Sequence, residues 1–191
     1  MFRQYIRPAL VSFLILTVIT GFIYPVFITG IAQALFHKEA NGSLIYRIGK
    51  VSGSSLIGQA FDDPRYLWGR ISATSPQYNA SNSSGSNIGP TNPALVDEVN
   101  GRVKALKACD PGNSSPIPVD LVTSSASGLD PQISPAAAYY QIPRIAGQRK
   151  IAENAVKDII RKNTADRFLG LIGEPTVNVL NVNLDLDSYK K

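Results

Sequence analysis

The fold of this chain is limited first by a long uncharged stretch near its start: residues 8–36 contain no Asp, Glu, Lys or Arg. The 28 residues from 9 to 36 would form a helix of about 42 Å, which exceeds the ~30 Å hydrocarbon core of a bilayer. We therefore predict a transmembrane helix over residues 9–36, preceded by a short N-terminal segment, residues 1–8. Tilt, a bend near Gly21 or Pro25, or an end that emerges from the bilayer would absorb the excess length.

A cleaved signal peptide is the alternative, because Ala32, Gln33 and Ala34 form the small-residue pattern that precedes a cleavage site. The apolar stretch is, however, about twice as long as the ~7–15 residues of a signal-peptide core. An uncleaved anchor is therefore the favoured interpretation.

The charges that flank the stretch predict which end lies inside the cell. Arg3 and Arg7 precede the helix, whereas His37, Lys38 and Glu39 nearly cancel after it. By the positive-inside rule, the N-terminus is cytoplasmic. Residues 37–191 then form a single extracytoplasmic domain, which is long enough to bury a core without disulfides.

Composition excludes several classes of function for this domain. The only histidine is His37 and the only cysteine is Cys109, so a His-based triad within the domain, a Cys/His zinc site and an intramolecular disulfide are excluded. Arg3 and Arg7 account for two units of the formal net charge of +5, and the remainder is too weak for a nucleic-acid-binding surface. We expect no metal site and no nucleic-acid partner.

Periodicity and turn residues predict a membrane-anchored α+β fold with one transmembrane helix and a single mixed domain. Alternating, β-branched stretches predict strands over residues 43–51, 117–122 and 177–186, the last with a bulge near its start. A capping residue followed by proline, at Asn92-Pro93 and again at Ser134-Pro135, predicts two helix starts. A third amphipathic helix is predicted around residues 152–160.

Two further expectations concern these helices. Pro143 should end the second helix, and Gly147 should weaken any immediate continuation. The first helix is predicted to face the core through a stripe at three- and four-residue spacings, formed by Leu95, Val96, Val99, Val103 and Leu106.

Two glycine-rich segments raise the question of ligand or partner binding. Residues 53–60 have the glycine spacing of a phosphate loop, but Gln59 and Ala60 replace its Lys and Ser/Thr, which favours a turn and a short strand. The segment between Arg70 and Asp97 is uncharged and rich in Ser, Asn, Gly and Pro, which predicts a long loop. The loop either presents hydrogen-bonding groups to a partner or to the domain, or is a solvated linker.

Short motifs follow one another along almost the entire chain. They are Thr20-Gly21, Tyr24-Pro25, Ala32-Gln33, Asn41-Gly42-Ser43, Leu56-Ile57-Gly58-Gln59, Phe61, Tyr66-Leu67-Trp68-Gly69-Arg70, Ser72-Ala73, Tyr78-Asn79, Gly85-Ser86-Asn87, Gly89-Pro90, Asn92-Pro93, Pro118-Val119-Asp120-Leu121-Val122-Thr123, Ser127-Gly128-Leu129-Asp130-Pro131, Tyr140-Gln141, Pro143-Arg144 and Val177-Asn178-Val179-Leu180. Each motif is weak alone, but their joint order and spacing are specific, and they resemble the KdpC family, a component of the potassium-transporting P-type ATPase known as the Kdp complex. Ile71, where the family usually has Pro, and Gln132, where it commonly has His, depart from the pattern.

The resemblance implies a non-catalytic accessory subunit in the bacterial inner membrane. Its implied partners are a channel-like potassium subunit, an ATP-hydrolysing P-type subunit and a small single-helix subunit, together with the lipid bilayer. The chain has no Asp-Lys-Thr-Gly phosphorylation motif and one membrane helix, which agrees with a subunit that neither transfers phosphate nor encloses a pore. ATP and K⁺ then act at the level of the complex, and this chain carries no cofactor of its own.

The family is described as a catalytic chaperone that raises the ATP affinity of the pump, with nucleotide contact assigned to the residue that is Gln141 here. ATP is cytoplasmic, whereas the flanking charges predict that Gln141 lies outside. A structural or ion-entrance role for Gln141 therefore agrees better with the predicted topology than nucleotide contact does. The simpler interpretation is that the Gln141 amide caps its own helix.

An enzyme of another class is the alternative function. A membrane-anchored extracytoplasmic serine-type enzyme could use Ser124, Ser125 or Ser127 near Asp130, but it would need a lysine base because the domain offers no histidine. Lys104, Lys107 or Lys150 would have to be brought there by folding.

Partner contact is predicted at two places. Small residues in the anchor, among them Gly30 and Ala32, allow another helix to approach closely. Tyr78, Ser86 and Asn87 in the loop over residues 71–96 would lie on the outer face of the channel-like subunit, near the entry of potassium.

Overall fold

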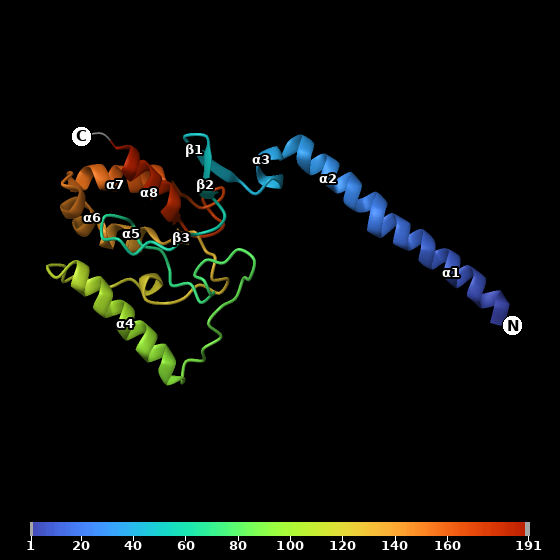
Figure 1. Ribbon diagram of the computed structural model, residues 1–191, viewed down its shortest axis with the longest axis horizontal. Coiled ribbons are helices and arrows are strands. Elements are labelled where there is room, and N and C mark those ends of the chain that lie inside the picture. The colour runs from blue at the N-terminus through green and yellow to red at the C-terminus, as the bar shows by residue number, and fades with distance from the viewer. Residues whose placement is uncertain (1, 190–191) are drawn as a thin grey trace. The chain divides into compact units, whose positions relative to one another are not determined.

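The computed structural model describes residues 2–189, which form one compact unit through Leu44 and a second from Ile45 onward. The first unit is an apolar helix, and the second is a domain of mixed helices and strands (Figure 1). The predicted fold class, one membrane helix followed by a single α+β domain, is confirmed.

The first unit is helical over almost its whole length. It consists of α1 (Phe2–Val18), a π-helical turn η1 (Ile19–Ile23), α2 (Tyr24–Leu35) and a short α3 (His37–Ala40). The helix from Gln4 to Leu35 has 32 residues and contains an 18-residue window with a mean hydropathy of 2.3, which makes it long and apolar enough to cross a membrane.

The π turn explains how a proline is accommodated in a continuous helix. Pro25 has no N–H, and its ring would clash with the carbonyl four residues earlier in an α-helix. The backbone widens just before it: the N–H of Tyr24 donates to the carbonyl of Ile19, five residues earlier. The Thr20 hydroxyl donates to the Leu16 carbonyl at 2.7 Å, which occupies a further backbone acceptor in this region.

The predicted strand over residues 43–51 is wrong, because the chain reverses within it. β1 (Leu44–Arg47) and β2 (Lys50–Ser54) pair as a two-stranded hairpin. The reversal occurs at Ile48 and Gly49, whose φ angles are +50° and +73°. Positive φ at both central residues is the geometry of a tight hairpin turn, in which Asn-Gly is the usual sequence signal. Because Ile48 occupies the position where Asn is usual, the sequence did not indicate this turn.

A second sheet joins three short strands in the order β3-β5-β4. β3 (Gln132–Ile133) and β4 (Thr164–Ala165) both pair antiparallel with β5 (Thr176–Asn178), which lies between them. Val177, the middle residue of β5, is fully buried.

The predicted C-terminal strand is also wrong beyond residue 178. α8 (Val179–Ser188) starts there, and the Asn178 side chain caps it by accepting from the Asn181 N–H at 3.0 Å. The expected bulge near Leu180 is the passage from strand to helix. The buried residues of α8 follow a helical spacing rather than an alternation: Val179, Leu180, Val182, Asn183 and Leu186.

The remaining helices begin where capping predicted. Asn92 caps α4 (Pro93–Cys109), and Ser134 caps α5 (Pro135–Tyr140). The amphipathic stretch forms α7 (Glu153–Lys162). α6 (Ile142–Arg149) corrects the expectation for Gly147, because it starts next to Pro143 and continues through the glycine.

Two expectations fail in part. The predicted edge strand over residues 117–122 contains instead the 3₁₀ turn η2 (Val119–Leu121), which follows Pro118. In the apolar stripe of α4, only Leu106 is buried, whereas Val96 is 57% exposed. α4 therefore meets the core through its last turns only.

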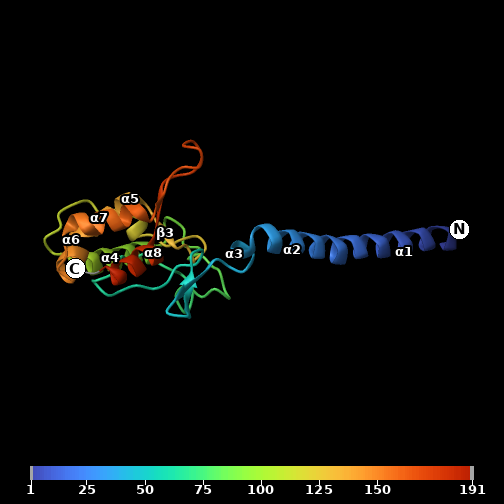
Figure 2. The same ribbon diagram turned by 90° about the horizontal axis from the view of Figure 1, so that it is seen from above.

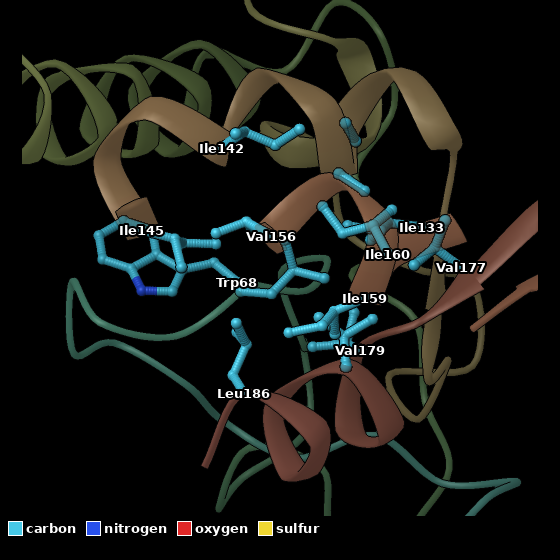
Figure 3. Packing of buried hydrophobic residues seen from close by; sticks show 14 of the residues in the cluster. Trp68, Ile133, Ile142, Ile145, Val156, Ile159, Ile160, Val177, Val179 and Leu186 are labelled. Atoms are coloured by element: carbon cyan, nitrogen blue, oxygen red, sulfur yellow. The ribbon is translucent and has the colours of Figure 1, made fainter. Parts of the chain in front are cut away.

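The core lies among α5, α6, α7 and α8, with β3 and β5 at one end (Figure 3). Trp68, from an extended segment without regular secondary structure, is 3% exposed and packs into this core. Side chains in the cluster include Ile133, Ile142, Ile145, Val156, Ile159, Ile160, Val177, Val179 and Leu186.

Candidate functional site

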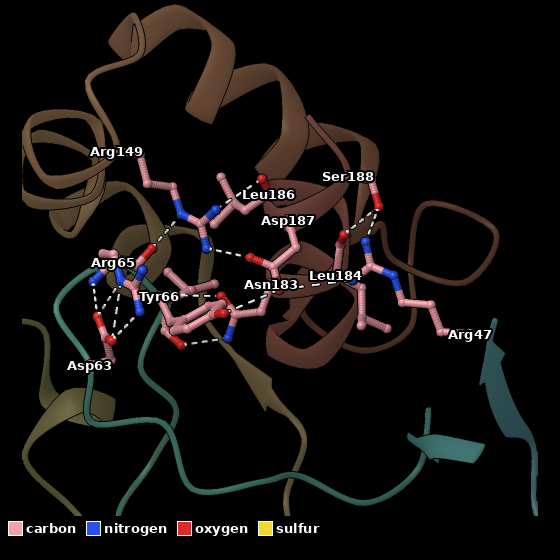
Figure 4. Close-up of polar contacts among 11 residues, drawn as sticks. Arg47, Asp63, Arg65, Tyr66, Arg149, Asn183, Leu184, Leu186, Asp187 and Ser188 are labelled. Carbon is pink, nitrogen blue, oxygen red and sulfur yellow. Dashed lines mark hydrogen bonds and ion pairs between the residues drawn. The ribbon is translucent and has the colours of Figure 1, made fainter. Parts of the chain in front are cut away.

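A segment over residues 64–70 begins in a turn, in which the Tyr66 N–H donates to the Asp63 carbonyl, then passes along the core and belongs to neither of the two sheets. We call it the clamped segment, because each of its seven backbone carbonyls accepts a hydrogen bond from a side chain. The donors are Arg144 for Pro64 and Tyr66, Arg149 for Arg65, Asn183 for Leu67, Gln141 for Trp68, Arg102 for Gly69 and the Tyr78 hydroxyl for Arg70. Figure 4 shows Arg149 and Asn183 reaching it from α6 and α8.

Two buried carboxamides make the backbone hydrogen bonds that a neighbouring strand would otherwise make. The Leu67 N–H donates to the Asn183 side-chain oxygen at 2.7 Å, and the Asn183 amide donates to the Leu67 carbonyl at 3.0 Å. Gln141 makes the same pair of bonds with Trp68, at 2.8 and 3.1 Å. Consecutive residues of an extended chain point their polar groups to opposite sides. One amide on each side therefore satisfies both.

Arginines hold the aromatic side chains of the same segment. The guanidinium groups of Arg144 and Arg102 lie 4.6 and 4.9 Å from the centre of the Trp68 ring, and that of Arg149 lies 4.8 Å from the Tyr66 ring. Burial lowers the pKa of Arg144 to about 10, so its guanidinium remains charged at neutral pH. At the exposed start of the segment, hydrogen bonds from Arg65 lower the pKa of Asp63 to about 2.

Gln141, the residue that the resemblance assigns to nucleotide contact, lies inside this network. Its side chain is 1% exposed, and its oxygen also accepts from Arg144 at 2.6 Å. Its amide nitrogen donates to the Ala137 carbonyl at 3.1 Å as well as to Trp68. The expected cap of its own helix is therefore present, and the whole amide is occupied by partners within the domain.

The predicted loop over residues 71–96 ends at Asn92, because α4 begins at Pro93, and its residues 71–92 are folded against the domain. The Ser72 hydroxyl donates to the Gly128 carbonyl at 2.7 Å and accepts from the Tyr78 N–H at 2.9 Å. The Thr74 hydroxyl accepts from the Asn79 N–H at 3.0 Å and, like Ser72, is buried. The two hydroxyls thus replace regular secondary structure inside the loop, which argues against a solvated linker.

Further along, the loop packs closely on the segment around residues 124–128. The Ser84 N–H donates to the Ser127 carbonyl at 3.0 Å. A side chain at Gly85 would approach the Ala126 carbonyl to 2.8 Å, and one at Gly128, which has a φ of +67°, would meet the Ser84 carbonyl at 2.5 Å. Glycine is needed at both positions because two backbones touch there.

The three loop residues predicted to contact a partner have different environments. Tyr78 is partly buried, donates to the Arg70 carbonyl at 2.7 Å and packs its ring on Gly58, and burial raises its pKa. The Ser86 hydroxyl lies 3.1 Å from that of Ser124. Asn87 is exposed at a φ of +52°, and its side chain has no hydrogen bond to the described part of the chain. Asn87 is therefore the one of the three that is presented to the outside.

A cleft of 340 Å³ separates the start of this loop from α4. Its lining is mixed in charge and includes Phe61, Arg70, Tyr78, Asp97, Glu98 and Arg102. Arg70 pairs with Asp130 at 3.3 Å and donates to the Ser124 carbonyl at 3.0 Å. Burial lowers the pKa of Arg102, which is bound to backbone carbonyls on its inner side.

The two anchor residues predicted to contact a partner lie on different faces of α2. Gly30 and Ala34 are four residues apart and share a face, whereas Ala32 points elsewhere. No heavy atom beyond its own helix backbone and chain neighbours lies within 4 Å of the position that a side chain would take at Gly30.

The serines of the alternative enzyme hypothesis are used within turns. The Ser127 hydroxyl accepts from the Leu129 N–H at 3.1 Å, and Ser124 bonds with Ser86. Asp130 pairs with Arg70 and also accepts from the Gln132 N–H at 2.9 Å. Within residues 2–189, no lysine donates to these side chains.

The two departures from the family pattern have backbone roles. Gln132 is an exposed residue of β3 that pairs with Asn178. Ile71 bridges to Ser124, and its carbonyl accepts from the Ser125 N–H at 3.1 Å.

Sequence reasoning missed most of the network around the clamped segment. Asn183 lies within the predicted strand over residues 177–186, and no sequence pattern singled out Arg149. The one available signal was Asn178, a capping residue three positions before Asn181, which could have indicated a helix in which Asn183 faces inward.

Comparison with known proteins identifies the family of the motifs. Residues 6–188 match the family described as "K+-transporting ATPase, c chain". A potassium-transporting ATPase KdpC subunit of Paraburkholderia xenovorans is 56% identical over 190 residues, covering 99% of each chain. Those of Dechloromonas aromatica and Janthinobacterium sp. are 58% and 59% identical, over 99% and 95% of this chain and 100% and 96% of theirs. The resemblance drawn from the sequence is confirmed.

The first prediction concerns the stability of the clamped segment. Gln141→Ala would leave the backbone N–H and C=O of Trp68 buried without partners, so we expect it to lower the free energy of unfolding by about 3 kcal/mol. Gln148→Ala removes an exposed glutamine from α6, the helix that follows Gln141, and should change the free energy of unfolding by less than about 0.5 kcal/mol. Because Trp68 is the only tryptophan, its emission during denaturation of the full chain reports both. Equal denaturation midpoints for the Gln141→Ala and Gln148→Ala variants would contradict a stabilising role of the Gln141 amide at the clamped segment.

Proposed function

The chain belongs to the family of c chains of the K⁺-transporting ATPase, and from this premise we propose that it is a non-catalytic accessory subunit needed for assembly and stability of the potassium import complex. Its proposed partners are a channel-like potassium subunit, an ATP-hydrolysing P-type subunit and a small single-helix subunit. The observation that supports this role best is the folded loop over residues 71–96. Its inner side is fixed to the domain by hydroxyls and close backbone contacts, while Asn87 faces outward.

The loop is suited to contact because its shape is fixed before binding. A flexible loop of this length would lose conformational entropy when a partner orders it, whereas a loop held by internal hydrogen bonds has already lost it. The loop also starts directly after the clamped segment, whose position is fixed by α6 and α8. The channel-like subunit would bind this loop near the entry of potassium.

The apolar helix provides the second proposed contact. Small residues at Gly30 and Ala34 on one face of α2 let a neighbouring helix approach closely in lipid. Two linked contacts raise the effective concentration of each, so neither needs high affinity. The proposed location is the bacterial inner membrane, with the N-terminus in the cytoplasm and the domain outside.

The second prediction tests this orientation. Arg3 and Arg7 should retain the N-terminus inside, so reporters fused before Met1 and after Lys191 should report opposite compartments. Replacing both arginines with Glu should reduce the fraction with the domain outside. A cytoplasmic C-terminal reporter, or a mature chain that begins near Leu35, would contradict the proposed topology.

The third prediction separates the two contacts. Gly30→Leu should fill the space used by a neighbouring helix and lower copurification of the partner subunits by roughly tenfold, or ~1.4 kcal/mol. Ala32→Leu tests the other predicted face. Ile31→Leu, which keeps a large apolar side chain between them, is the control.

In the same assays, Asn87→Lys should alter potassium uptake and potassium-stimulated ATPase activity while the complex still copurifies. Asn154→Lys places the same charge on the exposed side of α7 and should have no effect. Full assembly and unchanged uptake in the Gly30, Ala32 and Asn87 variants would reject the two-contact proposal and leave the helix as a tether.

The fourth prediction concerns the nucleotide role inherited from the family. Since the Gln141 amide is buried and fully bonded, we propose that it affects ATP dependence only through folding and assembly. Asn183→Ala disrupts the other half of the clamp and should therefore change ATP dependence in the same way as Gln141→Ala. Micromolar ATP binding by the full chain that is lost in Gln141→Ala but kept in Asn183→Ala would establish direct contact instead.

A further inference from the structure

An apolar arm leaves the domain between β4 and β5. Figure 2 shows it extending from the domain on the side opposite the β1–β2 hairpin. The four large side chains near its end are mostly exposed: Phe168 by 68%, Leu169 by 78%, Leu171 by 83% and Ile172 by 66%. Residues 168–173 carry no charged or hydrogen-bonding side chain. Such a cluster at the end of a projecting arm marks a contact with something outside the domain.

The turn at the end of the arm does not require these apolar residues. Phe168 and Ile172 exchange two backbone hydrogen bonds of 2.8 and 3.0 Å, and the Leu171 N–H donates to the Phe168 carbonyl at 3.1 Å. Leu169 and Gly170 have φ angles of +52° and +75°, a conformation that Asn, Asp or Gly adopts more easily than Leu. The Leu169 side chain thus stabilises neither the turn nor the core of the domain. We therefore look outside the domain for the surface that an apolar side chain at this position contacts.

The charges of the arm are confined to its base. Arg167 pairs with Glu174 at 2.7 Å, and both side chains are exposed. An apolar end followed by a charged collar is the pattern of segments that enter the interfacial layer of a bilayer. The residues that contribute most to protein–protein affinity are enriched in Trp, Tyr and Arg and depleted in Leu, whereas the end of the arm has two leucines, an isoleucine and Phe168. This composition favours lipid over a protein groove.

The chain itself keeps this arm near a membrane. The apolar helix ends at Leu35 and the domain begins at Ile45. The nine residues between them can span at most about 30 Å, even when fully extended. With the helix in a bilayer, the domain that carries the arm stays within reach of the membrane surface, which raises the effective concentration of the arm there, so weak affinity is sufficient.

We propose that residues 168–172 insert into the interfacial layer of the bilayer that holds the N-terminal helix. The domain then has two attachments to the membrane, the covalent helix and the arm, which together limit its rotation. The inference requires a membrane anchor but no partner subunit, so it can fail while the proposed accessory role stands.

The test places a reporter at the end of the arm in the full chain. In a Cys109→Ser background, Leu169→Cys is labelled with an environment-sensitive fluorophore, and the protein is reconstituted into phosphatidylcholine and phosphatidylglycerol vesicles that contain acyl-chain spin-labelled lipid. Insertion predicts a blue-shifted emission and quenching at least roughly three times that of the same label at Ser114→Cys, an exposed polar position. Quenching should persist in pure phosphatidylcholine, because Arg167 is already paired with Glu174.

A charged variant separates insertion from folding. Leu171→Asp should reduce the quenching of the label at residue 169 to the reference value, because a carboxylate resists entry into the acyl layer. Leu171 is 83% exposed, so the unfolding midpoint followed by Trp68 emission should not change. Quenching at the reference value in the parent protein would overturn the proposal. Shielding of the label only in the purified ATPase complex, without lipid quenching, would overturn it in favour of a groove on a partner subunit.

Discussion

A buried stretch of backbone must have partners for its N–H and C=O groups, and the domain depends on how residues 64–70 meet this requirement. In the described part of the chain, no strand pairs with them. Gln141 and Asn183 each offer one donor and one acceptor to a single residue of the segment, from opposite sides. These two carboxamides thus take the place of two strands, and they connect α8 and the α5–α6 junction through the segment between them.

The arginines around this segment combine three interactions. Arg144 donates to backbone carbonyls and to the Gln141 oxygen, and it lies over the Trp68 ring. Its burial would be costly for an isolated charge, but several acceptors and an aromatic face surround it. Arg149 similarly joins the segment to α8 through the Leu186 carbonyl and Asp187. A change at any of these positions therefore affects several elements together.

The clamped segment is directly continuous with one of the two surfaces at which we propose contact, the loop that contains Asn87, whereas the other surface, the apolar arm, leaves the small sheet. The clamped segment leads directly into the loop over residues 71–96, whose inner side is fixed through Ser72, Thr74 and Gly128. Asn87 is on its outer side, and the apolar arm between β4 and β5 projects from the small sheet. The chain belongs to the c chains of the K⁺-transporting ATPase, and the two surfaces are the places at which we propose contact with a partner subunit and with lipid.

The sequence alone determined the features that depend on local chemistry. The uncharged stretch before Phe36, the caps at Asn92 and Ser134 and the stripe of α7 each act within a few residues, so the membrane helix and three helix positions could be predicted. The ordered motifs determined the family. Tertiary structure decided the rest. The alternation in residues 180–186 is compatible with a strand, but these residues form a helix in which Asn183 bonds to Leu67. Ile48 is equally compatible with a strand, but the chain turns there. The two buried carboxamides bond to residues 73 and 116 positions away in the sequence, and no local pattern specifies which buried amide meets which backbone group.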